Sequence, residues 1–114
     1  MLPQVNRVKK KKDFEALFKN SRSFKNNLFI FKIAKNSLEI NRFGFVVSQK
    51  VSKRATVRNK VRRRLASAVR AEAKNTKAGA DVVIIALSGI EKKEFSEVKE
   101  AVKNTLIKSG LIDK

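Results

Sequence analysis

The sequence contains no cysteine, histidine, tryptophan or tyrosine, and only one proline. Without cysteine, disulfides, thiolate nucleophiles and zinc fingers are excluded. Without histidine, no imidazole general base exists, so Ser–His and Cys–His catalysis are excluded as well. Carboxylates holding a metal would remain, but Asp and Glu together number 10 and lie mostly near the two ends of the chain. We interpret Glu94, Glu97 and Glu100, which are spaced three apart, as a solvated helix edge, and we expect no catalytic residue in the protein.

Long apolar runs are also missing. No segment approaches the length of a membrane-spanning helix, and no apolar stretch follows the basic N-terminal residues as it would in a signal peptide. We therefore expect a cytoplasmic protein without a membrane partner. A chain of 114 residues with 42% hydrophobic residues fits one domain, residues 1–114, with a modest core. Residues 1–8 are expected to form an extended basic arm.

Positive charge dominates what the chain does contain. It has 28 Lys and Arg and a net charge of +18, and residues 40–71 hold ten Lys and Arg but no Asp or Glu. Such a charge opposes folding by self-repulsion unless a partner neutralises it. Within this window, residues 50–70 (KVSKRATVRNKVRRRLASAVR) keep Val57, Val61 and Leu65 at helical spacing. A rigid cationic helix on a folded domain indicates a polyanion partner, most simply a nucleic acid.

The hydrophobic pattern predicts an α+β protein of the α/β sandwich type, with a single mixed sheet of about four strands and three helices in the order α-β-β-(β)-α-β-α. The bracketed strand is a short segment within a hairpin connection at residues 36–41. We predict strands at residues 28–34, 42–48 and 81–87, and helices at residues 13–20, 57–75 and 94–108. Thr56 is the expected N-cap of the second helix, and Phe95, Val98, Val102 and Leu106 form the expected buried stripe of the last.

The basic helix has a distinct outer surface on a helical wheel. Arg58 and Arg62 form one flank of the apolar arc, while the opposite face carries Asn59, Arg63 and Arg70. Guanidinium groups can grip phosphate oxygens bidentately, and small outward residues at Ala66 and Ser67 would let a phosphate backbone come close. The helix N-terminus adds backbone donors and the positive end of the helix dipole.

Aromatic residues offer a second kind of contact. Phe14 and Phe18 lie on the first predicted helix, and Phe29 and Phe31 share one face of the first predicted strand. Unpaired RNA bases stack on such rings. Plain core packing is the other interpretation, and with no Tyr or Trp in the chain it is the one that composition favours.

The segment FGFVVSQKVSKRATVRNKVRRRLASAVR resembles the bacterial ribonuclease P protein family. Arg58 and Asn59, followed by Val61, Arg62, Arg63 and Leu65, look like the RNR signature of that family. NRVKKKKDFEALFKNSRSF is similar to its N-terminal segment, and DVVIIALSGIEKKEF to its last strand and loop. The resemblance covers nearly the whole chain, and the central motif is highly specific.

The resemblance implies the accessory subunit of an endoribonuclease that removes the 5′ leader from precursor tRNA. Catalysis would belong to the RNA subunit and its Mg²⁺ ions, with no cofactor held by the protein, and one protein would bind one RNA. The residues implied to contact the catalytic RNA are Lys50, Lys53, Arg54, Arg58, Asn59, Arg62, Arg63 and Arg70. A cleft between the sheet and the first helix would hold the single-stranded leader, lined by Phe14, Phe18 and Phe31.

The resemblance also implies an unusual left-handed β-α-β crossover around the basic helix, whereas the general rule predicts a right-handed one. Three positions depart from the family pattern. Gln49 stands where a basic residue is common, Leu87 where an arginine often follows the last strand, and Phe31 where a tyrosine is frequent. Each of these departures weakens one contact without breaking the resemblance.

Three other functions fit parts of the sequence. A structural RNA-binding protein of the ribosome has the same composition, and only the RNR signature and the implied leader cleft argue against it. A DNA-binding recognition helix is disfavoured because the long helix lies between strands, without a partner helix across a tight turn, so we expect no DNA partner. A carboxylate-dependent nuclease fails on the number and spacing of acidic residues.

Overall fold

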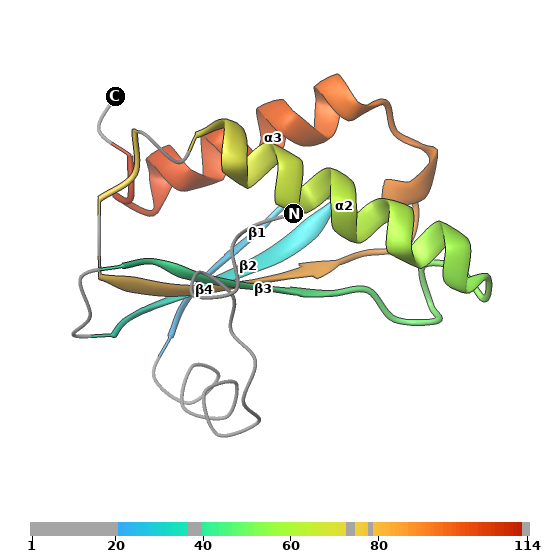
Figure 1. Ribbon diagram of the computed structural model, residues 1–114, viewed down its shortest axis with the longest axis horizontal. Coiled ribbons are helices and arrows are strands. Elements are labelled where there is room, and N and C mark those ends of the chain that lie inside the picture. The colour runs from blue at the N-terminus through green and yellow to red at the C-terminus, as the bar shows by residue number, and fades with distance from the viewer. Residues whose placement is uncertain (1–20, 37–39, 73–74, 78, 113–114) are drawn as a thin grey trace.

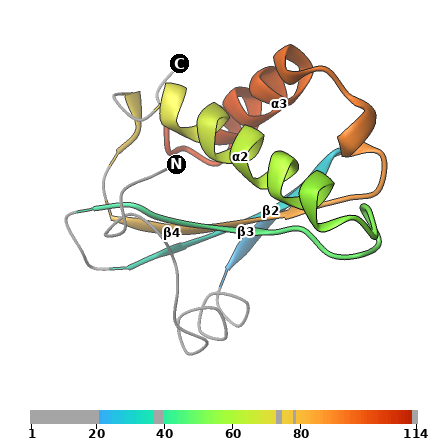
Figure 2. The same cartoon turned by 45° about the vertical axis from the view of Figure 1, so that its right-hand side comes forward.

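The computed structural model describes residues 21–36, 40–72, 75–77 and 79–112. These residues form a four-stranded sheet with two α-helices packed side by side on the same face of it (Figures 1 and 2). The elements are β1 Arg22–Lys25, β2 Phe29–Lys35, β3 Arg42–Val46, α2 Ala55–Ala71, β4 Ala80–Ala86, the short 3₁₀ helix η3 Ile90–Lys92, and α3 Phe95–Lys108.

The strand order in the sheet is β1-β2-β4-β3. β2 pairs antiparallel with both β1 and β4, whereas β3 pairs parallel with β4. Because β3 and β4 run the same way, the chain must cross over between them, and α2 makes that crossing. The predicted mixed sheet and the β-α-β unit are therefore confirmed, while the left-handed sense of the crossover stays a prediction.

The core lies between the sheet and the two helices. Alternate residues of β2, namely Phe29, Phe31 and Ile33, are buried on the helix-covered face, as period-two alternation requires. α2 and α3 supply the opposing layer with residues at three- and four-residue spacing: Val61, Leu65, Ala68 and Val69, and Val98, Val102 and Leu106. This burial fixes which side of α2 remains exposed.

An ion pair ties β3 to β4 near the start of both strands. Arg42 donates from Nε and Nη2 to the two carboxylate oxygens of Asp81, at 2.8 and 2.6 Å. Asn36 donates to the same carboxylate at 2.8 Å. One cation of the acid-free window is therefore neutralised inside the protein, and Arg42 serves the fold.

Several predicted details differ from the structure. The fourth strand is β1, before the predicted first strand, and no strand is described within residues 36–41. β1 was missed because three of its four residues are exposed, as suits an edge strand. α2 begins at Ala55 with Arg54 at its N-cap, so Thr56 is not the cap, and it ends at Ala71 instead of residue 75. The predicted first helix and the N-terminal arm lie outside the described residues.

The packing of α2 gives a first testable prediction. Leu65 is fully buried between helix and sheet, so Leu65→Ala should lower the free energy of unfolding by about 2–5 kcal/mol, because apolar burial is reduced and a cavity forms. Urea unfolding followed by circular dichroism measures this change. Ser67→Ala, on the exposed side of the same helix, should stay within about 0.5 kcal/mol of the parent. Equal effects at both positions would contradict the described orientation of α2.

Candidate nucleic-acid interface

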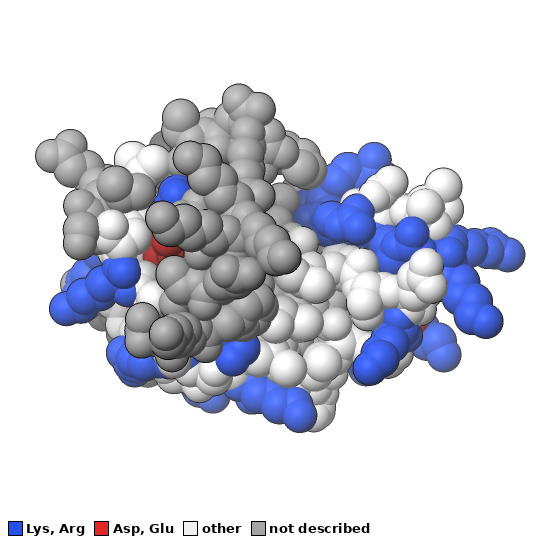
Figure 3. All heavy atoms as spheres, turned by 90° about the horizontal axis from the view of Figure 1, so that it is seen from below, with Lys and Arg blue, Asp and Glu red and all other residues white. Residues whose placement is uncertain are grey.

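The residues predicted to contact RNA lie in the loop that follows β3, residues 47–54, and along α2. We call residues 47–54 the basic loop. Figure 3 shows the molecule from the side of the sheet that α2 and α3 do not cover, and Lys and Arg side chains gather there at the end where α2 begins. The loop and the helix thus form one cationic end of the molecule.

The backbone of the basic loop is anchored to the core. Val47 and Val51 are both buried and belong to the core cluster. The carbonyl of Lys50 accepts a hydrogen bond from the hydroxyl of Ser88, in the turn after β4. The exposed side chains of Lys50 and Lys53 therefore extend from a fixed backbone instead of a freely moving one. Such preorganisation lowers the entropy cost of binding a ligand.

Arg58 links the helix to the loop. Its Nη1 donates to the backbone carbonyls of Ser52 and Lys53, at 3.0 and 2.9 Å. The side chain is half-buried, and one of its nitrogens is occupied by these two carbonyls. Arg58 therefore positions the loop, while Nε and Nη2 remain as donors that a phosphate could use.

The outer face of α2 presents the other predicted contacts. Asn59, Arg63 and Arg70 are exposed, as the helical wheel predicted. Arg62 donates from Nη1 to the side-chain oxygen of Asn59 one turn earlier, which orients its guanidinium group on the helix surface. Ala66 is only 1% exposed, so the expected close approach at that position is wrong, whereas Ser67 is exposed.

The N-terminus of α2 is open to an anion. Arg54 occupies the N-cap position without a side-chain cap hydrogen bond, and the first turn contains no acidic residue. The first backbone N–H groups of a helix have no partner within the helix and carry its positive dipole end. Together with Lys53 and Arg54, this end of α2 has the chemistry of a phosphate site.

Phe31 does not lie where the leader cleft was expected. Its exposed fraction is 0%, and it belongs to the core cluster on the face of the sheet that α2 and α3 cover. The ring also packs edge-on against Phe24, with centroids 6.2 Å apart. A nucleotide cannot reach a ring in this position, so the assignment of Phe31 to the cleft is wrong. Phe14 and Phe18, the other two predicted cleft residues, lie outside the described residues.

The opposite face of the sheet carries the alternate residues of β2. Ile30 and Lys32 have the other parity from Phe31 and are only partly buried. Lys32 donates from Nζ to the hydroxyl of Ser23 on β1, at 3.0 Å. Lys32 therefore places a cation on the sheet face opposite to Phe31, and the sequence interpretation did not consider this residue. The sequence already contained the signal for this placement, because neighbouring residues of a strand, such as 31 and 32, point to opposite faces of the sheet.

The last helix also differs from expectation at its first residue. Phe95 was predicted to belong to the buried stripe of α3, but 37% of its surface is exposed. Val98, Val102 and Leu106 are buried as predicted. The helical phase was correct, and the error comes from the position of Phe95 at the end of the helix, where the packing layer stops.

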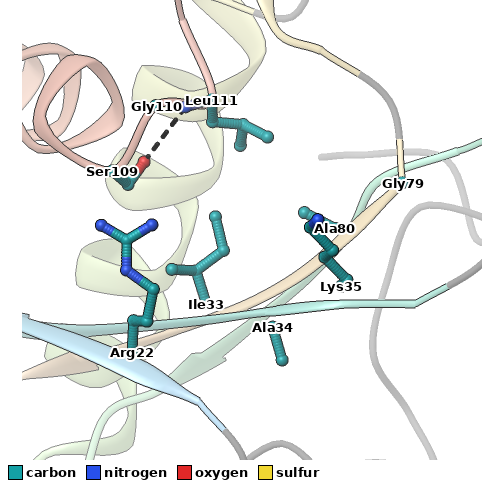
Figure 4. A pocket seen from close by; sticks show the side chains of 9 residues that line it. All are labelled: Arg22, Ile33, Ala34, Lys35, Gly79, Ala80, Ser109, Gly110 and Leu111. Carbon is teal, nitrogen blue, oxygen red and sulfur yellow. Dashed lines mark hydrogen bonds between the residues drawn. The ribbon is translucent and has the colours of Figure 1, made fainter.

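A cavity of about 530 Å³ lies at another edge of the molecule, between β2 and the turn after α3 (Figure 4). Arg22 points from β1 toward this turn, and Ile33 forms an apolar wall. The charged residues of the lining are Arg22 and Lys35, and no carboxylate from the described part of the chain lines it. Those residues therefore give the cavity no acid–base pair.

Catalytic groups are equally scarce elsewhere in the described part of the chain. Over those residues, no three Asp or Glu side chains come together as a metal-binding group. Asp81, the buried carboxylate at the start of β4, is occupied by Arg42 and Asn36. No helix among the described residues is both long enough and apolar enough to cross a bilayer. What the described residues offer is a cationic surface.

Comparison with known structures places the fold. The chain superimposes on a Staphylococcus aureus RNase P protein with a TM-score of 0.86 and 23% identity, covering 95% of this chain and 98% of that one. It superimposes on the RNase P protein from Thermotoga maritima with a TM-score of 0.81 and 29% identity, covering 90% and 96%. The fold of these proteins is thus the fold of this chain.

Comparison of sequences leads to the same family. The chain is 36% identical to the ribonuclease P protein component of Clostridium acetobutylicum over 109 residues, which are 94% of this chain and 91% of that protein. It is 37% identical to the Clostridium kluyveri protein of the same name, over 94% of this chain and 96% of that one. The family model described as Ribonuclease P matches residues 2–110. The chain with the anchored basic loop and the cationic helix α2 therefore belongs to the ribonuclease P protein family.

Proposed function

We propose that this chain is the protein subunit of ribonuclease P, which binds the catalytic RNA and the 5′ leader of precursor tRNA and assists removal of the leader. The observation that carries the proposal is the cationic surface of the anchored basic loop and α2. The surface is free of acidic residues over residues 40–71 and belongs to a chain of net charge +18. Family membership supplies the identity of the RNA.

The protein would act by binding and positioning. Exposed guanidinium and ammonium groups on α2 and the basic loop would neutralise phosphates of the RNA and release its counterions. Two folded anions, the catalytic RNA and its substrate, could then approach each other at lower electrostatic cost. The Mg²⁺ that the reaction requires would be held by the RNA. The protein would contribute no imidazole or thiolate to proton transfer or nucleophilic attack, in keeping with its lack of histidine and cysteine.

The leader of the precursor tRNA would contact the sheet on the face that α2 and α3 do not cover. Two features support this placement. The partly buried residues Ile30 and Lys32 belong to that face, and the cationic end formed by the basic loop adjoins it (Figure 3). An apolar surface next to cations suits a flexible single strand, because bases and phosphates then find separate partners. Phe31 has no part in this contact.

A cleavage assay tests the proposal directly. Precursor tRNA is incubated at low Mg²⁺ with a bacterial ribonuclease P RNA, with and without this protein. We expect the protein alone to be inert and the mixture to cleave at the mature 5′ end. RNA binding without any stimulation would contradict the proposal and favour a structural, ribosomal type of RNA-binding protein.

The salt dependence of binding to the same RNA measures how many phosphates the arginines of α2 neutralise. Arg62→Ala with Arg63→Ala should weaken binding roughly 30-fold, taking about 1 kcal/mol for each exposed phosphate contact. The slope of log K against log salt should fall by about one for each phosphate that the variant no longer neutralises. Lys108→Ala, an exposed cation at the far end of α3, is the matched control and should leave the slope unchanged. An equal effect of the double variant and of Lys108→Ala, counted per charge removed, would mean diffuse attraction without a binding face.

Arg58 and Arg63 should behave differently. Arg58 holds two backbone carbonyls of the basic loop, whereas Arg63 is exposed on the outer face of α2. Arg58→Ala should therefore lower both RNA affinity and the free energy of unfolding, the latter by about 1 kcal/mol. Arg63→Ala should lower RNA affinity alone, with unfolding within about 0.5 kcal/mol of the parent. Urea unfolding and filter binding on the same preparations separate the two roles, and unchanged stability in Arg58→Ala would contradict the positioning role.

A further inference from the structure

Phe95, the first residue of α3, is an apolar ring exposed next to cations. At 37% exposure, it keeps more than a third of its surface in contact with solvent, although burial of an apolar ring is favourable. In the described part of the chain, a guanidinium lies over the ring of Phe24, at 5.3 Å from its centroid, and no such contact is described for Phe95. The structure therefore leaves an aromatic surface available to a partner.

A hollow of about 360 Å³ connects this ring to α2. Four residues of α2 line it together with Phe95, and their spacing of i, i+3, i+4 and i+7 places them on one stripe of the helix. They are Lys60, Arg63, Arg64 and Ser67. Arg64 also donates from Nη1 to the carbonyl of Lys93 at 3.3 Å, which links this stripe to the chain just before α3. The hollow is thus a structural feature shared by two helices.

The charge around the hollow is positive. Glu94 and Glu97 are close to Phe95 in the sequence, but neither carboxylate lines the hollow. The carboxylate of Glu91 is engaged elsewhere, because it accepts the backbone N–H of Gly89 at 2.6 Å. An occupant of this site must offer a flat apolar face to the ring and negative charge to three cations. A nucleotide has both, since its base stacks and its phosphate pairs with Arg or Lys.

We propose that Phe95 and the α2 stripe Lys60, Arg63, Arg64 and Ser67 form a second RNA contact, in which an unpaired nucleotide stacks its base on Phe95 and places its phosphates against the cations. This inference rests on the proposed function, because it assigns the nucleotide to an RNA that the protein already binds. It adds Phe95, Lys60 and Arg64 to the interface. It also makes α2 contact RNA along two sides, one with Asn59 and Arg62 and one with Lys60 and Arg64.

Tryptophan fluorescence tests the contact, because the chain contains no tryptophan or tyrosine. Phe95→Trp introduces a single fluorophore at the proposed stacking position. Titration with a bacterial ribonuclease P RNA should quench its emission by at least half, since a stacked base quenches indole. Ile40→Trp is the matched control, because Ile40 has the same exposed fraction of 37% and lies in the connection between β2 and β3. Its emission should change little.

Affinity measurements complete the test. Phe95→Leu keeps an apolar side chain but removes the aromatic face, so it should weaken binding to the same RNA roughly tenfold, and Phe95→Tyr should restore it. A urea unfolding curve of Phe95→Leu that matches the parent shows that the weaker binding does not come from a folding defect. Replacing the RNA by a blunt duplex of equal length should abolish both the quenching and the difference between the variants.

The possible outcomes separate this inference from the proposed function. Binding of the parent protein with unquenched Phe95→Trp and full affinity in Phe95→Leu would overturn the stacking contact and leave the proposed function intact. Quenching of the duplex complex as strong as that of ribonuclease P RNA would also overturn it, since the bases inside a duplex stack on one another and, apart from its two ends, leave no face for a side chain. A parent protein that does not bind the RNA at all would overturn the proposed function itself.

Discussion

The burial of one side of α2 against the sheet is the interaction on which the rest of the molecule depends. α2 carries Lys and Arg but no acidic residue apart from the cap residue Glu72 that follows it, and such a helix would not be stable alone in water. Leu65, Ala68 and Val69 are fully buried and hold it in place. The apolar side thereby compensates for the repulsion between the cations on the other side. Because the helix is packed on the core, the backbone positions from which those cations extend are fixed relative to one another, which a disordered basic tail cannot provide.

The basic loop depends on the same packing. Val47 and Val51 hold the loop on the core, and Arg58 reaches back from α2 to two carbonyls of the loop. A residue of the RNR signature is thus part of the protein structure as well as a candidate for RNA contact. The internal bonds arrange the loop before RNA arrives, so the entropy cost of ordering it falls on folding and not on binding. Replacing Arg58 is therefore not equivalent to replacing an exposed arginine.

Patterns in the sequence predicted those parts of the fold that depend on periodicity. The strands β2, β3 and β4 follow from short apolar runs bounded by turn residues, and both described helices follow from helical spacing. The mixed sheet follows from the order of the elements. Alternation separates the two faces of β2 but does not say which face the helices will cover. The family resemblance assigned Phe31 to a cleft, whereas the residue lies in the core, as composition favoured. β1 was not predicted, because an exposed edge strand has no apolar alternation. The exposure of Phe95 was not predicted, because a helical wheel does not show where the neighbouring packing layer ends.

The positions of these two phenylalanines change the expected path of the RNA. Because Phe31 lies in the core, the leader in the proposed function would contact residues of the other parity of β2, where Lys32 adds a cation. With Phe95 exposed, the far side of α2 gains an aromatic surface among cations. A helix about 10 Å wide that offers phosphate partners on two sides cannot satisfy both with one straight strand of RNA. Either the RNA bends around α2 or two segments meet there, and both arrangements suit a folded catalytic RNA better than a regular duplex.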